Sequence, residues 1–334
     1  MFRRVIVVLV AALSGHALAQ DRPLPIIDMH LHANRADDNG PPPTYICPGF
    51  ESDAHDPRQP WADAFMAVMK KPGCANPLVG AETDEALMKT TFEILERRNI
   101  IGVTSGPLLD RWRETGGDRI IPAAAFGFGS AAPSAATLGE WFATRRYLVF
   151  AEVGIQYQGV SPSDPRFEPY LAVAEAVDVP MGIHIGTGPT GAPYLPGLGN
   201  YRARLHSPLE LEDALVRHPK LRVYIMHAGW PMLDDLLAVL WVHPQVHVDV
   251  GIICYALPRK AFHRYLERIV EAGFGSRVMF GSDQMNWPGA IEHCIEAIDS
   301  ATFLAPKQKR DILYDNAARF LRLTPEQIAR HHGR

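Results

Sequence analysis

Two histidines separated by a single residue end the first apolar run of the chain, Ile26–His32. In an extended strand, side chains two residues apart point to the same face, so His30 and His32 can bind the same ion. A neutral imidazole nitrogen is a good ligand for zinc and related divalent metals. Taken alone the pair is weak evidence, because histidines packed in a core or exposed at the surface also occur at this spacing.

Three later apolar runs end in the same way. His184 ends the run Met181–His184, His227 directly follows Val223–Met226, and Asp283 comes just after Val278–Gly281. In a barrel of parallel strands the carboxyl ends all open onto one face, so these side chains would converge. The set predicts a divalent metal site, with zinc the preferred ion and one ion preferred over two. Because His and carboxylate ligands also accept manganese, iron and cobalt, the identity of the metal stays open.

Glu152 is a further candidate ligand, in the apolar run Phe150–Gly154. Its apolar neighbours argue against an ordinary surface residue, although a buried glutamate paired with an arginine would give the same pattern. His247 and Asp249 alternate on another expected strand. For these two we expect a supporting network around the ligands rather than direct metal ligation.

The candidate residues need a scaffold, and from residue 80 onward short apolar runs alternate with helical patterns. This alternation predicts parallel strands joined by right-handed crossovers. Eight strand–helix units favour a (β/α)₈ TIM barrel over a doubly wound sheet, and no Gly-rich phosphate loop follows the first strand. The expected strands are Ile26–His32, Ile100–Thr104, Ile120–Phe128, Tyr147–Ile155, Pro180–Ile185, Val223–Met226, Val246–Ile252 and Val278–Gly281.

Residues 1–19 predict a secretory signal peptide. Arg3 and Arg4 precede the apolar run Val5–Leu13, and Ala17-Leu18-Ala19 forms a small-residue cleavage pattern. The run is too short to span about 30 Å of hydrocarbon. We therefore expect a periplasmic or secreted protein whose residues 20–334 form one barrel domain, with residues 306–323 as a closing helix.

Residues 33–80 interrupt the repeating pattern directly after the first strand and are expected to form a lid-like insertion on the face that carries the site. Trp61 and Phe65 favour an ordered segment. Four cysteines allow three pairings, or none, and Cys47–Cys74 is the preferred disulfide. The prolines are too many for regular structure: Pro41, Pro42, Pro43, Pro48, Pro57, Pro60, Pro72 and Pro77.

The charge balance limits the partners. The chain carries 33 Lys and Arg against 37 Asp and Glu, a net charge of -4, so it has no general attraction to nucleic acid or anionic lipid. A small-molecule substrate is the expected partner, with no membrane association after signal cleavage. A homodimer is left open.

In this order the motifs resemble the amidohydrolase superfamily, and within it the amidohydrolase-related branch that includes aminocarboxymuconate-semialdehyde decarboxylase-like enzymes. The resemblance extends from Pro25 to Leu323. It implies a TIM barrel that holds a metal through His30, His32, His184 and Asp283. Further supporting motifs are Ile225–Pro231, Val248–Val250, Phe280–Asp283 and Asn316–Leu321.

The resemblance also implies roles for single residues. Many relatives bridge two metals with a carboxylated lysine on strand four, but no lysine occurs here between Lys89 and Lys220, so that bridge is excluded. In other branches of the family a glutamate on the same strand bridges or ligates metal, and the resemblance gives Glu152 that role beside the alternative of a buried pair with an arginine. Asp283 would take a proton from the water that the metal activates. His227 would bind or polarise the substrate, or orient that water. A bound metal lowers the pKa of water from about 16 to about 7, and a neighbouring carboxylate can then accept the proton.

Three functions fit these features. The leading one is a metal-dependent hydrolase acting on an ester, lactone or amide. The alternative is a non-oxidative decarboxylase, in which Arg111, Arg113 or Arg202 would bind the substrate carboxylate. The export signal favours hydrolysis, because catabolic decarboxylases usually work inside the cell. A binding protein that kept the barrel without catalysis is the third.

Overall fold

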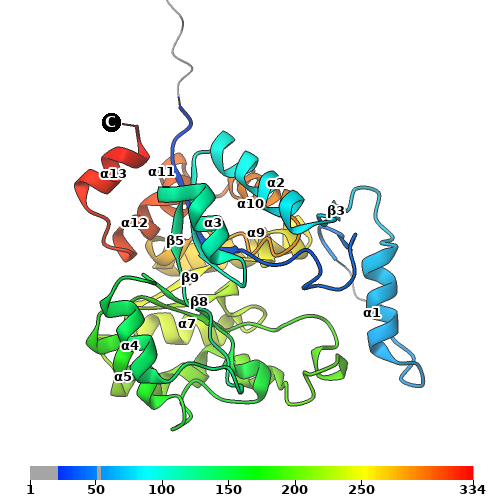
Figure 1. The fold of residues 1–334 in the computed structure, drawn as a ribbon, viewed down its shortest axis with the longest axis horizontal. Helices are drawn as coiled ribbons and strands as arrows, with labels where there is room; N and C mark the ends of the chain where they lie inside the picture. The colour runs from blue at the N-terminus through cyan, green and yellow to red at the C-terminus, as the bar shows by residue number, and fades with distance from the viewer. Residues whose placement is uncertain (1–21, 51–53, 334) are drawn as a thin grey trace, which may run out of the picture.

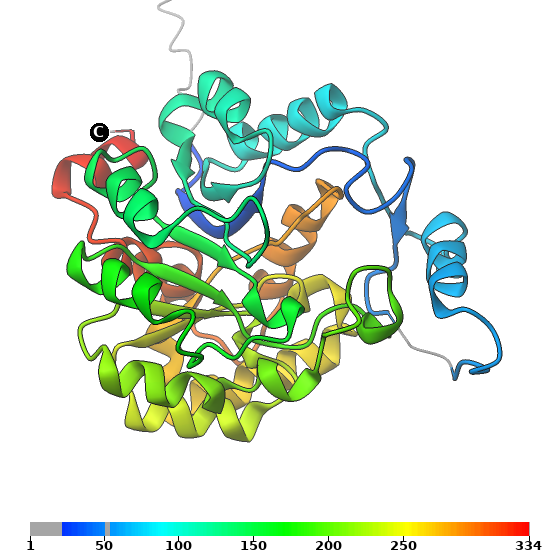
Figure 2. The same ribbon diagram turned by 60° about the horizontal axis from the view of Figure 1, so that its bottom comes forward.

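The computed structural model describes residues 22–50 and 54–333, so the expected signal peptide lies outside the described residues. Eight parallel strands surround one axis, with helices on the outside (Figures 1 and 2). The predicted (β/α)₈ barrel is confirmed. Its strands are β1 (Ile26–His32), β4 (Ile100–Ser105), β5 (Ile120–Pro122), β6 (Phe150–Val153), β7 (Met181–His184), β8 (Val223–Met226), β9 (Val246–Asp249) and β10 (Val278–Met279).

The barrel closes at two joints between continuous ladders. The ladders run in the orders β1-β4-β5 and β10-β9-β8-β7-β6. A parallel bridge between Ala123 and Val149 links the β5 side to the β6 side. At the other joint the Met29 N–H donates to the Phe280 carbonyl, with 2.9 Å between nitrogen and oxygen. Each strand therefore has a neighbour on both sides, and the described barrel has no free edge.

Five strands are shorter than the sequence predicts, namely β5, β6, β7, β9 and β10, and the difference is largest for β5 and β6. The expected run Ile120–Phe128 pairs with β4 only as far as Pro122, and beyond it only isolated bridges to the β6 side remain, from Ala123 to Val149 and from Phe126 to Val153. The expected strand Tyr147–Ile155 is reduced to β6, whose register shifts between Phe150 and Val153. Several apolar residues beyond both ladders remain buried, among them Ala124, Phe126, Val149 and Ile155. An apolar run in the sequence therefore indicates burial rather than ladder pairing.

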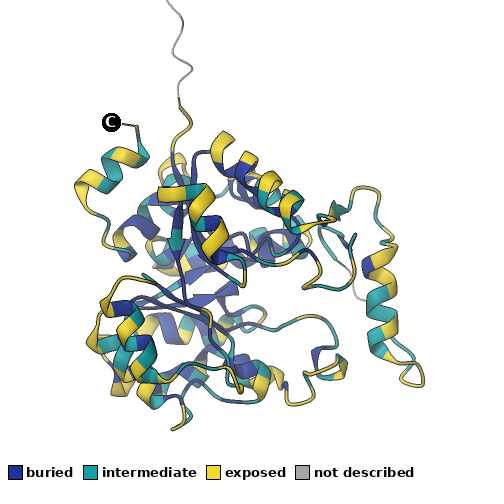
Figure 3. Cartoon of the chain, viewed as in Figure 1, coloured by how far each residue is buried: buried dark blue, intermediate teal, exposed yellow. Residues whose placement is uncertain are grey.

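Most of the barrel helices bury one face against the strands and expose the other (Figure 3). None of the helices within residues 22–50 and 54–333 combines the length and apolar character needed to cross a membrane. The barrel helices are α2 (Asp84–Arg97), α3 (Leu109–Gly116), α4 (Ala135–Ala143), α5 (Glu168–Ala176), α6 (Glu212–Arg217), α7 (Leu233–Val242), α8 (Ile253–Ala256), α9 (Arg259–Ile269) and α10 (Gly289–Asp299).

The C-terminal segment closes the floor of the barrel. It comprises α11 (Pro306–Arg310), a π-helical turn (Asp311–Asp315), α12 (Asn316–Phe320) and α13 (Pro325–His331). Tyr314 and Phe320 pack with Met29 and Tyr224 in an apolar cluster inside the barrel. The single helix expected over residues 306–323 is thus interrupted by a π turn and ends at Phe320, shortly before Arg322 adopts a positive φ of 55°.

Residues 33–80 contain regular structure, contrary to the expectation drawn from their prolines. The two-residue strands β2 (Tyr45–Ile46) and β3 (Leu78–Val79) pair antiparallel, and α1 (Trp61–Lys70) lies between them in sequence. Pro60 precedes the first turn of this helix and Pro72 follows its end, and proline is tolerated at both places.

The structure contains two disulfides, one in the insertion of residues 33–80 and one between two helices. The predicted Cys47–Cys74 disulfide is confirmed and closes the segment that contains α1. Cys254 and Cys294, whose state the sequence left open, form a second disulfide between α8 and α10. The disulfides link neighbouring segments on the outside of the barrel.

Candidate metal centre

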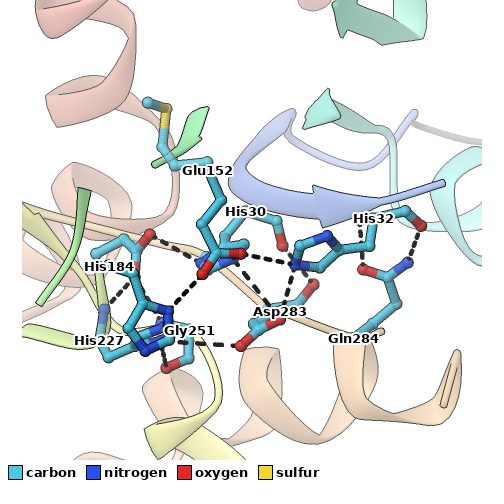
Figure 4. Close-up of polar contacts among 12 residues, drawn as sticks. His30, His32, Glu152, His184, His227, Gly251, Asp283 and Gln284 are labelled. Carbon is cyan, nitrogen blue, oxygen red and sulfur yellow. Dashed lines mark hydrogen bonds and ion pairs between the residues drawn. The ribbon is translucent and has the colours of Figure 1, made fainter. Parts of the chain in front are cut away.

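Six polar side chains from five strand ends meet at the carboxyl end of the barrel (Figure 4). They come from β1, from β6, from β7 and from the turns that follow β8 and β10. The structure therefore brings together every site residue that the sequence predicts: His30, His32, Glu152, His184, His227 and Asp283.

One group of ligand atoms lies beside β1. The Nε2 atom of His32 is 2.9 Å from Asp283 Oδ1, and the Nε2 atom of His30 is 3.6 Å from the same oxygen. Glu152 Oε2 lies 3.4 Å from His30 Nε2 and 3.6 Å from His32 Nε2. Two imidazoles and two carboxylates thus point their ligand atoms at one small space.

A second group lies on the other side of Glu152. Its Oε1 atom makes a short hydrogen bond with His184 Nδ1. The Nε2 atom of His227 is 3.1 Å from the same His184 nitrogen. The two oxygens of the Glu152 carboxylate therefore face two different sets of histidines.

The turns that present His227 and Asp283 have unusual backbone conformations. His227 has a φ of 61° and Asp283 a φ of 50°, values that are rare outside glycine. Such conformations cost about 1–3 kcal/mol each and persist only where the surroundings enforce them. At Asp283 the N–H donates to the His30 carbonyl at 2.7 Å, which fixes the turn against β1.

Several supporting residues become visible only in the structure. Gln284 holds the backbone of His32 at both ends: its Oε1 accepts from the His32 N–H at 3.0 Å, and its Nε2 donates to the His32 carbonyl at 2.6 Å. The hydroxyl of Tyr157 is 3.1 Å from His184 Nε2. Gln284 directly follows Asp283 in sequence, which could have drawn attention to it, whereas nothing in the sequence marks Tyr157.

Both carboxylates in the cluster remain ionised despite their burial. Burial alone would raise the pKa of Glu152, but the neighbouring His184 and His30 hold it well below its usual range. The pKa of Asp283 is lowered in the same way, with burial outweighed by His30 and His32. For His30, burial would lower the pKa, and Asp283 and Asp249 instead raise it well above its ordinary value. The two ionised carboxylates therefore favour a positive charge beside them, from a protonated histidine or from a bound cation.

His227 is neutral at physiological pH. Burial, together with the neighbouring His184, lowers its pKa to about 4. Its Nδ1 lies 3.0 Å from the carbonyl oxygen of Gly251, which can only accept, so Nδ1 carries the proton. The Nε2 atom therefore presents a lone pair to the cluster.

The donor set fits a divalent cation. Neutral imidazoles and ionised carboxylates are the ligands that zinc and its neighbours prefer. Among the described residues, three triads place their ligand atoms within 4.8 Å of one another: His30, His32 and Glu152; Glu152, His184 and His227; and His30, His227 and Asp249. Glu152 belongs to two of these triads.

The arginines suggested as carboxylate-binding groups are engaged elsewhere. Arg111 pairs with Glu85 at 3.0 Å, and both side chains are largely exposed. Arg113 donates to the carbonyl of Arg146. Arg202 donates to carbonyls of its own loop. In this structure none of the three contacts the candidate ligands.

Solved structures of similar fold include hydrolytic and decarboxylating enzymes. An uncharacterized TIM-barrel protein from Bordetella bronchiseptica is 18% identical, with a TM-score of 0.61 over 93% of this chain and 100% of its own. A 2,6-dihydroxybenzoate decarboxylase complexed with 2,6-dihydroxybenzoate is 15% identical (TM-score 0.54, 90% and 100% covered). A probable 2-pyrone-4,6-dicarboxylic acid hydrolase from Acinetobacter baumannii is 16% identical (TM-score 0.55, 89% and 99% covered).

Among curated proteins, no significant match is found. The family comparison is decisive, because the amidohydrolase family model matches residues 27–323, nearly all of the barrel and its closing segment. The motifs at the strand ends and the barrel itself agree with this match. The chain belongs to the amidohydrolase family and is an enzyme of that family.

Proposed function

We propose that the protein is a metal-dependent hydrolase that cleaves an ester, lactone or amide bond in a small molecule. The observation that carries the proposal is the position of Glu152, whose two carboxylate oxygens face separate groups of histidines. This arrangement favours two divalent ions, with zinc the preferred metal, over the single ion preferred from the sequence, and Glu152 would contribute to the binding of both. His30, His32 and Asp283 would hold one ion, and His184 and His227 the other.

Divalent ions bound at this centre would acidify a water molecule and polarise the substrate carbonyl. Asp283 is the group placed to move the proton, because its lowered pKa keeps it ionised at neutral pH. It would accept the proton from the attacking water and pass it to the leaving oxygen or nitrogen. Water is thereby added across the scissile bond.

The protonation state of His227 narrows its role. With its proton on Nδ1, bonded to the Gly251 carbonyl, it has no N–H to donate to a substrate oxygen. Its bare Nε2 lies beside His184 Nδ1. Of the roles implied by the family resemblance, this geometry supports ligation over polarisation of the substrate.

Two arguments support hydrolysis over decarboxylation. The position of Glu152 between two groups of histidines would let the centre hold two divalent ions, a kind of centre that is common in enzymes that activate water. Arg111, Arg113 and Arg202, which a decarboxylase could use for its substrate carboxylate, bond to other partners. One protein of similar fold is a probable hydrolase of 2-pyrone-4,6-dicarboxylic acid, which is compatible with a lactone substrate here.

We also propose that the protein works outside the cytoplasm. The basic and apolar start of the chain and two disulfides support export to an oxidising compartment, the periplasm or the exterior. This placement restricts the substrates to molecules that reach that compartment.

Elemental analysis of the purified protein tests the metal centre. We expect about two ions per chain in the wild type, as two-ion hydrolases hold, and a loss of at least one ion in Glu152→Gln. Glu93→Gln changes an exposed glutamate on α2 and serves as the matched control. A wild-type content of one ion, unchanged in Glu152→Gln, would show that Glu152 is not a bridge.

Turnover assays with esters, lactones and amides, run beside measurements of CO₂ release from aromatic and unsaturated acids, test the reaction. We expect hydrolysis without CO₂ release. His30→Ala should abolish metal retention, and Asp283→Asn should lose turnover at least as severely as metal. Release of CO₂ from an acid, with no hydrolysis of any ester or lactone, would replace the hydrolase with a decarboxylase on the same centre.

A further inference from the structure

Asp249, at the end of β9, is fully buried beside the metal centre. Its Oδ1 atom accepts hydrogen bonds from the backbone N–H groups of His227 and Gly251, both at 2.9 Å. Its Oδ2 atom lies 3.3 Å from His30 Nδ1. Neither this oxygen nor this nitrogen has another hydrogen-bond partner, although both are buried. Asp249 Oδ2 and His30 Nδ1 are therefore placed to form a hydrogen bond with each other.

The opposite nitrogen of the same ring faces the ligands. His30 Nε2 lies 3.4 Å from Glu152 Oε2 and 3.6 Å from Asp283 Oδ1. An imidazole binds a metal only through a nitrogen that carries no proton, so ligation through Nε2 requires the ring proton on Nδ1. Among the described residues, Asp249 is the group positioned to accept the hydrogen bond of that proton.

We propose that Asp249 is a positioning residue that fixes the tautomer and ring orientation of His30, so that Nε2 is free to bind metal. The inference rests on the proposed metal centre. The same carboxylate also holds the backbone of His227, so a single buried side chain links residues from both groups of ligands.

Two glycines make this contact sterically feasible. A Cβ atom on Gly251 would lie 2.8 Å from His30 Nδ1 and 3.3 Å from Asp249 Oδ1. A Cβ atom on Gly281 would lie 3.0 Å from His30 Cβ and 3.1 Å from Asp249 Cγ. A side chain at either position would clash with His30 or Asp249. Glycine has no side chain, so the carboxylate and the imidazole can approach each other between Gly251 and Gly281.

Direct metal ligation by Asp249 is the competing role, since its ligand atoms lie within 4.8 Å of those of His30 and His227. The geometry disfavours it. Oδ1 already accepts two N–H groups, and Oδ2 faces Nδ1 of His30, the nitrogen turned away from Glu152 and Asp283. The number of ions bound at saturation distinguishes the two roles.

Asp249→Asn tests the proposal with almost no change in volume. The amide oxygen can still accept from His227 and Gly251, which forces the amide NH₂ toward His30 Nδ1. A donor at that position favours the tautomer with a bare Nδ1 and a proton on Nε2, the nitrogen that must bind metal. We expect zinc affinity, measured by competition with a chelator, to fall about 10- to 100-fold, while the number of ions bound at saturation stays that of the wild type.

Asp28→Asn is the matched control. Asp28 is also buried, and its Oδ1 accepts from the backbone N–H groups of His30 at 3.0 Å and Ser282 at 2.9 Å without an imidazole contact. An asparagine oxygen at position 28 keeps both bonds, so zinc affinity should stay within about threefold of the wild type. This change is far smaller than the loss expected for Asp249→Asn, in which the partner of a ligating histidine is altered. Equal affinities for Asp249→Asn, Asp28→Asn and the wild type would overturn the proposal, and a lower ion count in Asp249→Asn would replace it with direct ligation.

A measurement on the wild type makes the test independent of how well the variants fold. In zinc-loaded protein labelled with ¹⁵N, we expect the His30 ring to carry its proton on Nδ1. A ring proton on Nε2 in that sample would contradict the proposal even though the metal is bound. Failure of the wild type to bind zinc at all would instead remove the proposed function, and with it this role for Asp249.

Discussion

Glu152 and Asp283 are ionised carboxylates at a place where burial alone would favour the neutral acids. The histidines around them reverse that preference. The pKa of His30 is raised well above its ordinary value, so its ring holds a proton that offsets the negative charge of the carboxylates. A bound cation would offset the same charge. Metal binding must displace protons from such histidines, so metal affinity should rise with pH.

Tyr157 tests how much a single hydroxyl contributes to the centre. Its OH group is 3.1 Å from His184 Nε2, and no other described hydrogen bond holds that nitrogen. We expect Tyr157→Phe to free the His184 ring and weaken binding of the ion that His184 holds by about 10-fold, as measured by chelator competition.

Tyr201→Phe is the control for this variant. Tyr201 lies near Tyr157, with ring centroids 5.8 Å apart, but its hydroxyl accepts from the Gly188 N–H rather than contacting a ligand. Equal metal affinities for the two variants would show that the Tyr157 hydroxyl does not position His184.

At the scale of elements, the turns after the strands place the ligands as much as the strands do. The β10 ladder ends at Met279, yet Asp283 lies four residues further on. Hydrogen bonds to β1 hold the intervening turn, including the one from Asp283 N–H to the His30 carbonyl. The insertion is similarly tied to a distant loop, because the Trp61 indole N–H donates to the carbonyl of Thr190 at 2.9 Å.

Trp61→Ala should detach α1 from the loop that follows β7. The indole also packs on Gly191, where a Cβ atom would lie only 2.1 Å from Trp61 Nε1. Because few contacts hold a surface segment of this kind, we expect faster proteolytic cleavage within residues 33–80 and little change in the melting temperature of the barrel. Mass spectrometry of limited digests locates the cuts.

Trp241→Ala provides the comparison, because Trp241 lies on α7 and is 78% exposed. Its digestion pattern should match that of the wild type. If Trp61→Ala also matches the wild type, the contact with Thr190 does not hold α1 in place.

At the scale of the whole molecule, ring closure and the C-terminal segment determine where charge is buried. The carboxyl end of the barrel gathers the charged ligands, while Tyr314, Phe320 and Tyr224 fill the opposite end with apolar side chains. His247, expected from the sequence in the network around the ligands, lies instead at that apolar end, with its ring 4.7 Å from the ring of Phe320. Burial lowers the pKa of His247 to about 4.

This pKa shift predicts a loss of stability in acid. His247 stays neutral in the folded protein while the unfolded chain takes up a proton below about pH 6.5, so the free energy of unfolding falls as the pH drops from 6.5 toward 4. The contribution of this residue at pH 5 is about 2 kcal/mol.

Urea unfolding at pH 8 and pH 5 measures this effect. His247→Gln should lose about 2 kcal/mol less than the wild type between the two values, since glutamine does not titrate. His55→Gln, in the insertion outside the barrel, is the control and should behave as the wild type does. Identical pH dependence for His247→Gln and the wild type would contradict the assigned contribution.

Local sequence patterns were sufficient to predict the barrel and the set of side chains that meet in it. An apolar run that ends in a polar residue marks a strand end, and a spacing of two marks a shared face, so His30, His32, His184 and His227 could be found from neighbours in sequence alone. Proline positions were less informative, because Pro60 and Pro72 flank α1 instead of preventing it.

Only the tertiary structure decided how these side chains face one another. Glu152 reaches His30 across 122 positions of sequence, and Gln284 holds His32 across 252. The two-sided position of Glu152, the contact between Asp249 and His30, and the hydroxyl of Tyr157 beside His184 all depend on the turns and on closure of the ring. A sequence pattern reports the direction and burial of a side chain relative to its own strand, whereas the distances that set ligation and tautomer arise between strands that meet only when the barrel closes.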